Sequence, residues 1–203
     1  MVREIILAIL IGYLLGSIPF AYVIGQGFYN KDIRKYGSRN LGGSNAGRVL
    51  GKKAGLSVMV LDLLKVFLAT FIVSFFENTE AAMIFAGFFA AIGHCYPVFV
   101  NFKGGKAVAA LYGFLLGMTV FGSYNILIFL LPLLMFFLVL YLWKIISLAS
   151  MCSSVFVAAY VGITQESKLM FGALCAFAVL IIYRHRANVV RMIQGKENKI
   201  KWM

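Results

Sequence analysis

Charged residues are scarce in this chain of 203 residues: 13% are Asp, Glu, Lys or Arg, about half the share in a soluble domain. Acidic residues are the scarcest, with seven Asp and Glu against 19 Lys and Arg, so the net charge is +12. A basic excess can indicate a nucleic-acid partner, but such a partner requires a water-soluble basic face. Here the basic residues lie between long apolar runs, and mean hydropathy is +0.92. The composition predicts a polytopic membrane protein that binds no nucleic acid.

Ligands for metals and partners for disulfides are also few. The chain has two histidines, and its three cysteines, Cys95, Cys152 and Cys175, are scattered through apolar segments without CxxC spacing. Free cysteines of this kind are usually small buried hydrophobic residues. We therefore expect no disulfide, no metal site and no cofactor.

What the sequence has in abundance is apolar runs long enough to cross a bilayer, which takes about 20 residues as a helix. We expect the first run to be a retained span rather than a signal peptide. Gly12, Gly16 and Ser17 would let another helix pack closely against it, and Pro19 should kink it. No repeat is visible, so we expect one all-α membrane domain over residues 1–203. Seven transmembrane helices are predicted, over residues 5–24, 54–76, 81–100, 107–121, 124–143, 147–163 and 169–183.

The basic residues predict the topology. The connection over residues 26–53 holds seven Lys and Arg against a single acid, Asp32. With seven spans, 16 of the 19 Lys and Arg fall on one side of the membrane. Because positive loops stay in the cytoplasm, the N-terminus is predicted outside and the C-terminus inside. We expect the protein in the cell (inner) membrane, with its active site on the cytoplasmic face.

A glycine–lysine turn follows the third predicted span. Gly104 and Gly105 lack a Cβ, so their backbone can approach a ligand closely, and Lys103 and Lys106 add positive charge. Lys106 falls where the next helix should begin, and helix N-termini bind phosphate. The alternative is a plain basic loop that follows the positive-inside rule.

The first connection carries a second polar group, residues 37–48, with four glycines, two serines, two asparagines and two arginines. Glycine allows close approach, Ser and Asn supply neutral donors, and arginine offers a planar fork to phosphate. Ser38, Asn40, Asn45 and Arg48 are therefore candidate ligand contacts. A solvated basic loop is the alternative.

Two ionisable residues fall inside the second predicted span. Asp62 and Lys65 are three positions apart, so they share a helix face. They are expected to pair with each other, and a proton or ion path is the alternative. His94, near the end of the third span, is expected to make a local hydrogen bond rather than to act in catalysis.

Further polar residues follow the fifth and seventh spans. Ser147 could cap the next helix or turn its hydroxyl into a site. His185, Asn188 and Arg191 are spaced by three, so one helical stripe could carry all of them.

Four blocks in this order resemble the acyl-phosphate-dependent glycerol-3-phosphate acyltransferases of bacterial membranes. They are GSRNLGGSNAGRVLGKKAG at 37–55, LDLLK at 61–65, GHCYPVFVNFKGGKAVA at 93–109 and RHRANVVRMIQGKE at 184–197. The His–Asp dyad of many other acyltransferases is absent, since Phe99 and Val190 occupy the positions where its Asp would stand.

The resemblance implies acyl transfer from a fatty acyl-phosphate to the 1-hydroxyl of sn-glycerol 3-phosphate, giving 1-acyl-sn-glycerol 3-phosphate and phosphate, without an obligate protein partner. Either His185 or a phosphate oxygen of a substrate could accept the hydroxyl proton. The residues expected in the site are Ser38, Arg48, Lys106, His185 and Asn188 as catalytic groups, and Asn40, Asn45, Lys103, Gly104, Gly105 and Ser147 as substrate contacts.

A membrane carrier for phosphorylated metabolites is the alternative function, since it too could present a basic, glycine-rich mouth. A carrier of that kind is expected to have internal repeats and polar groups near the bilayer midplane. The chain offers only Asp62 and Lys65 there, and no repeat.

Overall fold

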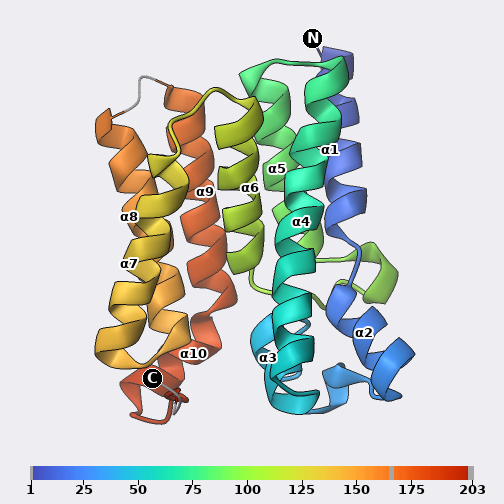
Figure 1. The fold of residues 1–203 in the computed structure, drawn as a ribbon, viewed down its shortest axis with the longest axis vertical. Helices are drawn as coiled ribbons and strands as arrows, with labels where there is room; N and C mark the ends of the chain where they lie inside the picture. The colour runs from blue at the N-terminus through green and yellow to red at the C-terminus, as the bar shows by residue number, and fades with distance from the viewer. Residues whose placement is uncertain (1, 165–166, 201–203) are drawn as a thin grey trace. The chain divides into compact units, whose positions relative to one another are not determined.

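The computed structural model describes residues 2–164 and 167–200, and all regular structure in these ranges is helical (Figure 1). The all-α prediction is therefore confirmed for this part of the chain. Compactness divides the chain into two units, residues 1–123 and 124–203, and each is described by itself.

Unit 1 is a bundle of long apolar helices with shorter helices at one end. Its elements are α1 (Val2–Gly16), α2 (Phe20–Tyr29), the 3-10 turn η1 (Ile33–Lys35), α3 (Gly43–Val49), α4 (Lys52–Phe76), α5 (Glu80–Cys95), the 3-10 turn η2 (Val98–Val100) and α6 (Val108–Phe121).

Small residues bring α1 and α5 together, as predicted. A side chain at Gly12 would overlap the carbonyl of Ala86, and one at Gly16 would overlap that of Ala90. Such small-residue faces let helix backbones approach closely in a membrane, where the hydrophobic effect contributes little to helix association. The GxxxG spacing of α1 thus fixes its partner.

The first predicted span, residues 5–24, is interrupted at Pro19 within a helical stretch that runs from Val2 to Tyr29. α1 ends at Gly16 and α2 begins at Phe20, directly after Pro19. Proline has no amide hydrogen and disfavours helical backbone in the residue before it. The break leaves the carbonyl of Ile18 outside the helical pattern, where it accepts a hydrogen bond from Lys65 Nζ at 2.8 Å.

The connection over residues 26–53 is more ordered than its glycine content suggests. η1 and α3 lie within it, and their apolar side chains form a small core beneath the polar surface. Burial of this core against α2 and α4 fixes the loop that carries the candidate ligand contacts. The core consists of Ala21, Ile33, Leu41, Ala46, Val58 and Val100.

Unit 2 comprises α7 (Leu127–Trp143), α8 (Ile146–Thr164), α9 (Lys168–Arg184) and α10 (Arg186–Ile193). α8 packs against both α7 and α9. The hydroxyl of Ser153 on α8 donates to the Pro132 carbonyl on α7 at 2.8 Å. α10 is bent by 58° from α9 at a break at His185, so it runs across the end of the unit.

The apolar helices differ in length. In the described ranges, four helical stretches are long and apolar enough to cross a membrane: residues 2–29, 52–76, 80–100 and 146–164. The bent pair α9 and α10 adds a fifth, whereas α6 and α7, with 14 and 17 residues, are shorter.

Candidate functional site

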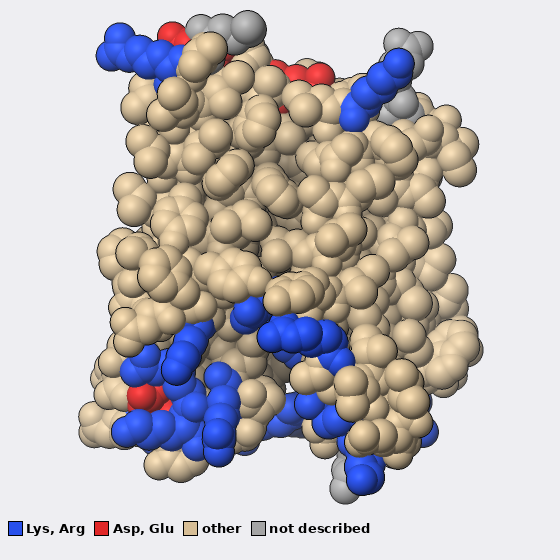
Figure 2. All heavy atoms as spheres, turned by 180° about the vertical axis from the view of Figure 1, so that it is seen from behind, with Lys and Arg blue, Asp and Glu red and all other residues tan. Residues whose placement is uncertain are grey.

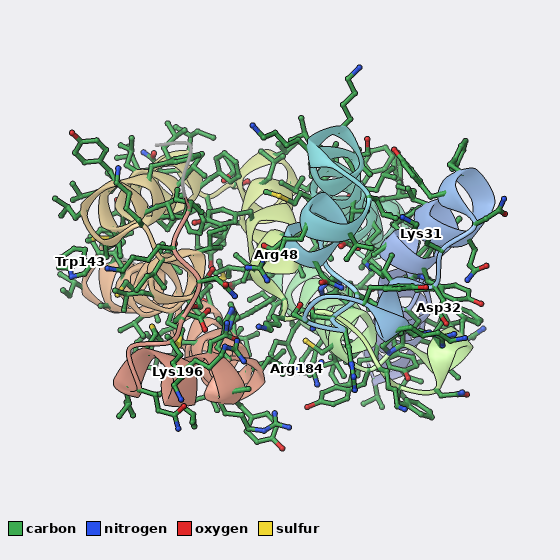
Figure 3. The ribbon with its side chains drawn as sticks, turned by 90° about the horizontal axis from the view of Figure 1, so that it is seen from below. Lys31, Asp32, Arg48, Trp143, Arg184 and Lys196 are labelled. Atoms are coloured by element: carbon green, nitrogen blue, oxygen red, sulfur yellow. The ribbon has the colours of Figure 1, made fainter. Side chains whose placement is uncertain are left out.

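Positive charge gathers at one end of each unit (Figure 2). In unit 1 this end carries residues 26–53 and the turn at 103–106, whereas Glu77 and Glu80 lie at the opposite end. In unit 2 it carries Lys144 and the described residues that follow α9, up to Ile200. Figure 3 labels Lys31 and Arg48 in unit 1, and Arg184 and Lys196 in unit 2. Within each unit the charges are distributed as the sequence predicts.

The glycine–lysine turn packs against the end of α5. The amide of Gly105 donates to the His94 carbonyl at 2.9 Å, so it is directed at protein. A side chain at Gly104 would overlap that same carbonyl, and one at Gly105 would overlap the His94 ring. Glycine is therefore required at both positions, because Gly104 touches the backbone of α5 and Gly105 touches the His94 ring. Lys106 is half-buried and lies two residues before α6, as expected.

The first connection reaches this turn directly. The side-chain amide of Asn40 donates to the Gly104 carbonyl at 3.0 Å, across 64 positions of sequence. Two of the predicted segments therefore meet at one end of unit 1, and Asn40 is the residue that joins them.

Asn45 is buried and organises the loop around it. Its amide nitrogen donates to the carbonyls of Ile33 and Tyr36, both at 3.2 Å, and its amide oxygen accepts the backbone N–H of Ser38 at 2.8 Å. Its contacts are with its own loop, which leaves Ser38 exposed at the surface. Arg48, on α3, is also exposed. Asn45 thus fixes the position from which Ser38 can meet a ligand.

Asp62 and Lys65 pair with each other, as expected. Lys65 Nζ lies 2.8 Å from Asp62 Oδ1, and each side chain is only 3% exposed. His94 joins them from α5, with Nδ1 3.4 Å from the same Oδ1. These residues form a buried charged network within the apolar helices, and an ion pair of this kind is expensive to disrupt.

A different polar group lies in unit 2, around the carboxylate of Glu197. Ser147 Oγ and Asn188 Nδ2 donate to Oε1 at 2.9 and 2.6 Å, and Arg191 Nε donates to Oε2 at 2.7 Å. Two predicted site residues, Ser147 and Asn188, therefore meet although 41 positions separate them in the sequence. Ser147 lies inside the first turn of α8, and its hydroxyl reaches Glu197 rather than capping the helix.

Glu197 is a residue that the sequence analysis did not single out. Burial alone would raise the pKa of this carboxyl, but the hydrogen bonds from Asn188, Arg191 and Ser147 outweigh burial and lower its pKa below the ordinary 4.5. The carboxylate is therefore ionised at neutral pH. The sequence feature that could have indicated Glu197 is that it is the one acidic residue in the basic tail after residue 184.

His185 lies at the break between α9 and α10 and is buried. Its Nδ1 lies 2.8 Å from the Ile181 carbonyl, which can only accept a hydrogen bond. In the neutral ring, the proton is therefore on Nδ1, and Nε2 carries the lone pair that a base requires. Asn188 and Arg191 lie on α10 and His185 is its N-cap, so the three residues lie along one helix at the spacing of three that the sequence shows.

Apolar helices of membrane-spanning length, with cationic and hydroxyl donors at one end of each unit, define an integral membrane protein suited to anionic ligands. Comparison with known proteins identifies the family. The family model described as glycerol-3-phosphate acyltransferase matches residues 6–195, and the chain belongs to this family. The predicted family and enzyme class, an acyltransferase of membranes, are confirmed.

Relatives match over their full length. The glycerol-3-phosphate acyltransferase of Staphylococcus haemolyticus is 40% identical over 98% of this chain and 99% of its own length. That of Listeria monocytogenes is 42% identical, with both chains covered completely. A crystal structure of PlsY (YgiH), an integral membrane glycerol 3-phosphate acyltransferase, in its glycerol 3-phosphate form has a TM-score of 0.88 and 32% identity, covering 97% of this chain and 96% of that one. Its lysphosphatidic acid form has a TM-score of 0.84.

Proposed function

We propose that this protein transfers a fatty acyl group from a fatty acyl-phosphate to the 1-hydroxyl of sn-glycerol 3-phosphate. The hydroxyl oxygen attacks the acyl carbonyl, and the bond between that carbonyl carbon and the phosphate oxygen breaks. The products are 1-acyl-sn-glycerol 3-phosphate and inorganic phosphate. An acyl-phosphate is already activated, so no covalent enzyme intermediate is needed.

The observation that carries the proposal is the hydrogen bond from Asn40 to Gly104. It joins the serine- and arginine-bearing loop to the glycine–lysine turn, so that both act on one ligand. Phosphate is the ligand that this chemistry fits, because arginine and lysine neutralise it and hydroxyl and amide groups donate to its oxygens. Both substrates carry phosphate.

In unit 1 we assign the phosphate contacts to Lys106, Arg48 and Lys103, with Gly104 and Gly105 allowing close approach. We assign Ser38, which is exposed, to donate to a phosphate or carbonyl oxygen. Holding the reactants in attack geometry can contribute about 7–11 kcal/mol in favourable cases. Most of the acceleration is therefore assigned to positioning.

In unit 2 we assign Asn188 to stabilise charge on the reacting acyl oxygen, a contribution of about 2.7–4 kcal/mol for one donor. Ser147 is assigned to substrate binding. Their bonds to Glu197 orient both groups. For the hydroxyl proton, Nε2 of His185 and a substrate phosphate oxygen are the two candidate acceptors. We favour the phosphate, because the chain has no His–Asp dyad to strengthen the histidine as a base.

We further propose that seven helices cross the inner membrane: α1 continued by α2, then α4, α5, α6, α7, α8 and α9. The N-terminus is assigned outside and the C-terminus in the cytoplasm, because the basic end of each unit should face inward. Single cysteines at Lys31 and Asn78, in a background without native cysteine, would test this. An impermeant label added to intact cells should reach only the cysteine at position 78. Labelling of the cysteine at position 31 instead would mean that the topology is the reverse of the one proposed.

The catalytic proposal is tested with purified protein in lipid nanodiscs, a fatty acyl-phosphate and labelled glycerol 3-phosphate. We expect labelled 1-acyl-glycerol 3-phosphate and one inorganic phosphate per turnover. Nanodiscs have no compartments, so a carrier for phosphorylated metabolites would give no product. The pairing of Asp62 with Lys65 also favours the enzyme, since those charges serve each other rather than a path.

We propose that residues 1–203 act as one domain, because the family model matches residues 6–195, which include most of both units. Residues 1–123 and 124–203 expressed separately should show no transfer, and activity should return only when both are expressed together. Activity of either fragment alone would contradict the single-domain assignment.

A further inference from the structure

The buried charges in unit 1 have no part in the reaction as described so far. Asp62 and Lys65 lie within α4 and His94 within α5, each almost fully buried. Ionisable groups at such depth in a membrane protein usually serve a function. The question is what this network holds in place.

One end of the network secures the break after α1. Lys65 Nζ is 2.8 Å from Asp62 Oδ1 and also donates to the Ile18 carbonyl at 2.8 Å. The Lys65 ammonium thus satisfies a backbone oxygen that Pro19 leaves outside a helix. This contact ties α4 to the junction of α1 and α2.

The other end reaches the glycine–lysine turn. Asp62 Oδ1 lies 3.4 Å from His94 Nδ1, and the His94 carbonyl accepts the amide of Gly105 at 2.9 Å. The His94 ring lies against Gly105, so closely that a side chain at Gly105 would overlap Nε2 and its neighbouring ring carbons. His94 therefore contacts Gly105 through both its ring and its backbone.

The turn needs external support because the backbone on both sides of it is strained. Phe102 and Ala107 have φ of 57° and 60°, values that residues other than glycine, Asn and Asp rarely adopt. Each such residue costs about 1–3 kcal/mol and persists only where the surrounding structure enforces it. The Asn40 side chain holds one side of the turn, through the Gly104 carbonyl. His94 holds the other side.

We propose that Asp62, Lys65 and His94 form a positioning network that holds Gly104 and Gly105 in the conformation that receives the phosphate of glycerol 3-phosphate. This inference rests on the proposed function. The carboxylate of Asp62 fixes the position of the His94 ring. The ring in turn sets how closely the Gly105 backbone can approach the end of α5. His94 is thus a positioning residue that acts through Gly105.

Two double variants test the steric part. Gly105→Ala should raise the KM for glycerol 3-phosphate about tenfold or more while changing kcat much less, because it displaces the turn. Adding His94→Ala removes the ring that the new methyl group would strike, so Gly105→Ala/His94→Ala should have a KM no higher than His94→Ala alone. Gly104→Ala is the matched control: its methyl group would meet backbone and Pro97, so His94→Ala should not rescue it. Equal behaviour of the two double variants would overturn the proposal.

A second pair tests the electrostatic part and does not depend on the glycines. His94→Asn and His94→Leu have nearly the same shape, but only Asn keeps an N–H close to Asp62. The KM of His94→Asn should lie closer to that of the parent protein than the KM of His94→Leu does. Equal KM values in two variants with equal melting temperatures would exclude a role for the hydrogen bond.

The activity of the parent protein distinguishes failure of the proposed function from failure of the positioning network. If the parent protein makes no acylated product, the proposed function fails, whatever the variants do. If it is active and the Gly105 and His94 substitutions are simply additive in KM, only the positioning network is wrong.

Discussion

The polar clusters around Asp62 and Glu197 are built in the same way but differ in how deeply their cations are buried. In each, one carboxylate gathers partners from two elements: Asp62 contacts Lys65 on its own helix and His94 on α5, and Glu197 accepts hydrogen bonds from Ser147 on α8 and Asn188 on α10. The cation beside Asp62 is Lys65, with 3% of its side chain exposed, whereas Arg191 beside Glu197 is 37% exposed. An uncompensated charge is costly only where water cannot reach it. We therefore expect unit 1 to depend on its charges for folding, and unit 2 to use its charges mainly to orient polar groups.

The largest effect is expected at the glycine–lysine turn of unit 1, where substrate is proposed to bind. Lys106→Ala should reduce acyl transfer about a thousandfold or more, equivalent to about 4 kcal/mol of lost transition-state stabilisation. The protein should remain folded, because this side chain is only half-buried. Initial rates with labelled glycerol 3-phosphate measure the loss. Lys53→Ala, at an exposed position near the start of α4, is the control and should stay within about twofold. Near-normal turnover in Lys106→Ala would remove the turn from the site.

The second prediction contrasts the two ion pairs directly. Lys65→Met should lower the free energy of unfolding by about 3–5 kcal/mol, because it leaves the buried Asp62 without its cation. Arg191→Met should cost about 1 kcal/mol or less, because Arg191 is itself 37% exposed and Glu197, at 5% exposed, keeps its hydrogen bonds from Ser147 and Asn188. Unfolding in mixed detergent micelles gives both values. Equal losses would mean that burial does not distinguish the clusters.

A third variant tests what Glu197 does in unit 2. Glu197→Gln keeps the size of the side chain but removes its charge, and hydrogen bonds to charged groups contribute about 1.5–3 kcal/mol. Asn188 and Ser147 should lose their orientation, so kcat should fall more than KM rises. Glu80→Gln is the matched control. Glu80 lies in unit 1, at the end opposite that unit's basic residues, and its substitution should leave kcat and KM unchanged. A Glu197→Gln variant with parental kcat would show that the carboxylate does not orient the site.

The fourth prediction concerns the proton. His185→Gln should reduce kcat by about tenfold, less than the 10²–10⁴ expected for loss of a general base, because a substrate phosphate can accept the proton. Single-turnover rates measure the chemical step itself. A loss beyond about a thousandfold in a folded variant would assign the base to His185 instead.

The smallest effect is expected when stability is measured as a function of pH in the acid range. Hydrogen bonds lower the pKa of Glu197 below 4.5 in the folded protein, so the folded state binds fewer protons than the unfolded chain. Its contribution to stability is therefore complete above the unfolded pKa and is lost as the pH falls through the folded pKa. The difference in unfolding free energy between the parent and Glu197→Gln should shrink below pH 4.5. A difference that is constant with pH would contradict the assigned pKa direction.

The sequence predicted those features that depend on local chemistry. Apolar runs predicted the helices, Gly12 and Gly16 predicted a close helix contact, and the spacing of Asp62 and Lys65 predicted their pairing. Each follows from helix geometry, so a single segment carries the information.

Contacts between distant segments could not be predicted in this way. Nothing in the sequence pairs Asn40 with Gly104, or Glu197 with Ser147, because such contacts depend on how the helices pack. The seventh span was predicted to end at residue 183, one residue before α9 ends, but the bend of 58° at His185 could not be predicted because it depends on packing. The glycines of the turn were correctly singled out, but Gly105 is needed to fit against His94 and its amide is directed at protein.

The most direct test of the central claim is a crystal structure of this protein with glycerol 3-phosphate bound. We predict that the phosphate lies within hydrogen-bonding distance of Lys106 Nζ, beside the Gly104–Gly105 backbone. A phosphate bound elsewhere, with Lys106 making no contact to it, would contradict the claim that the glycine–lysine turn is the phosphate site.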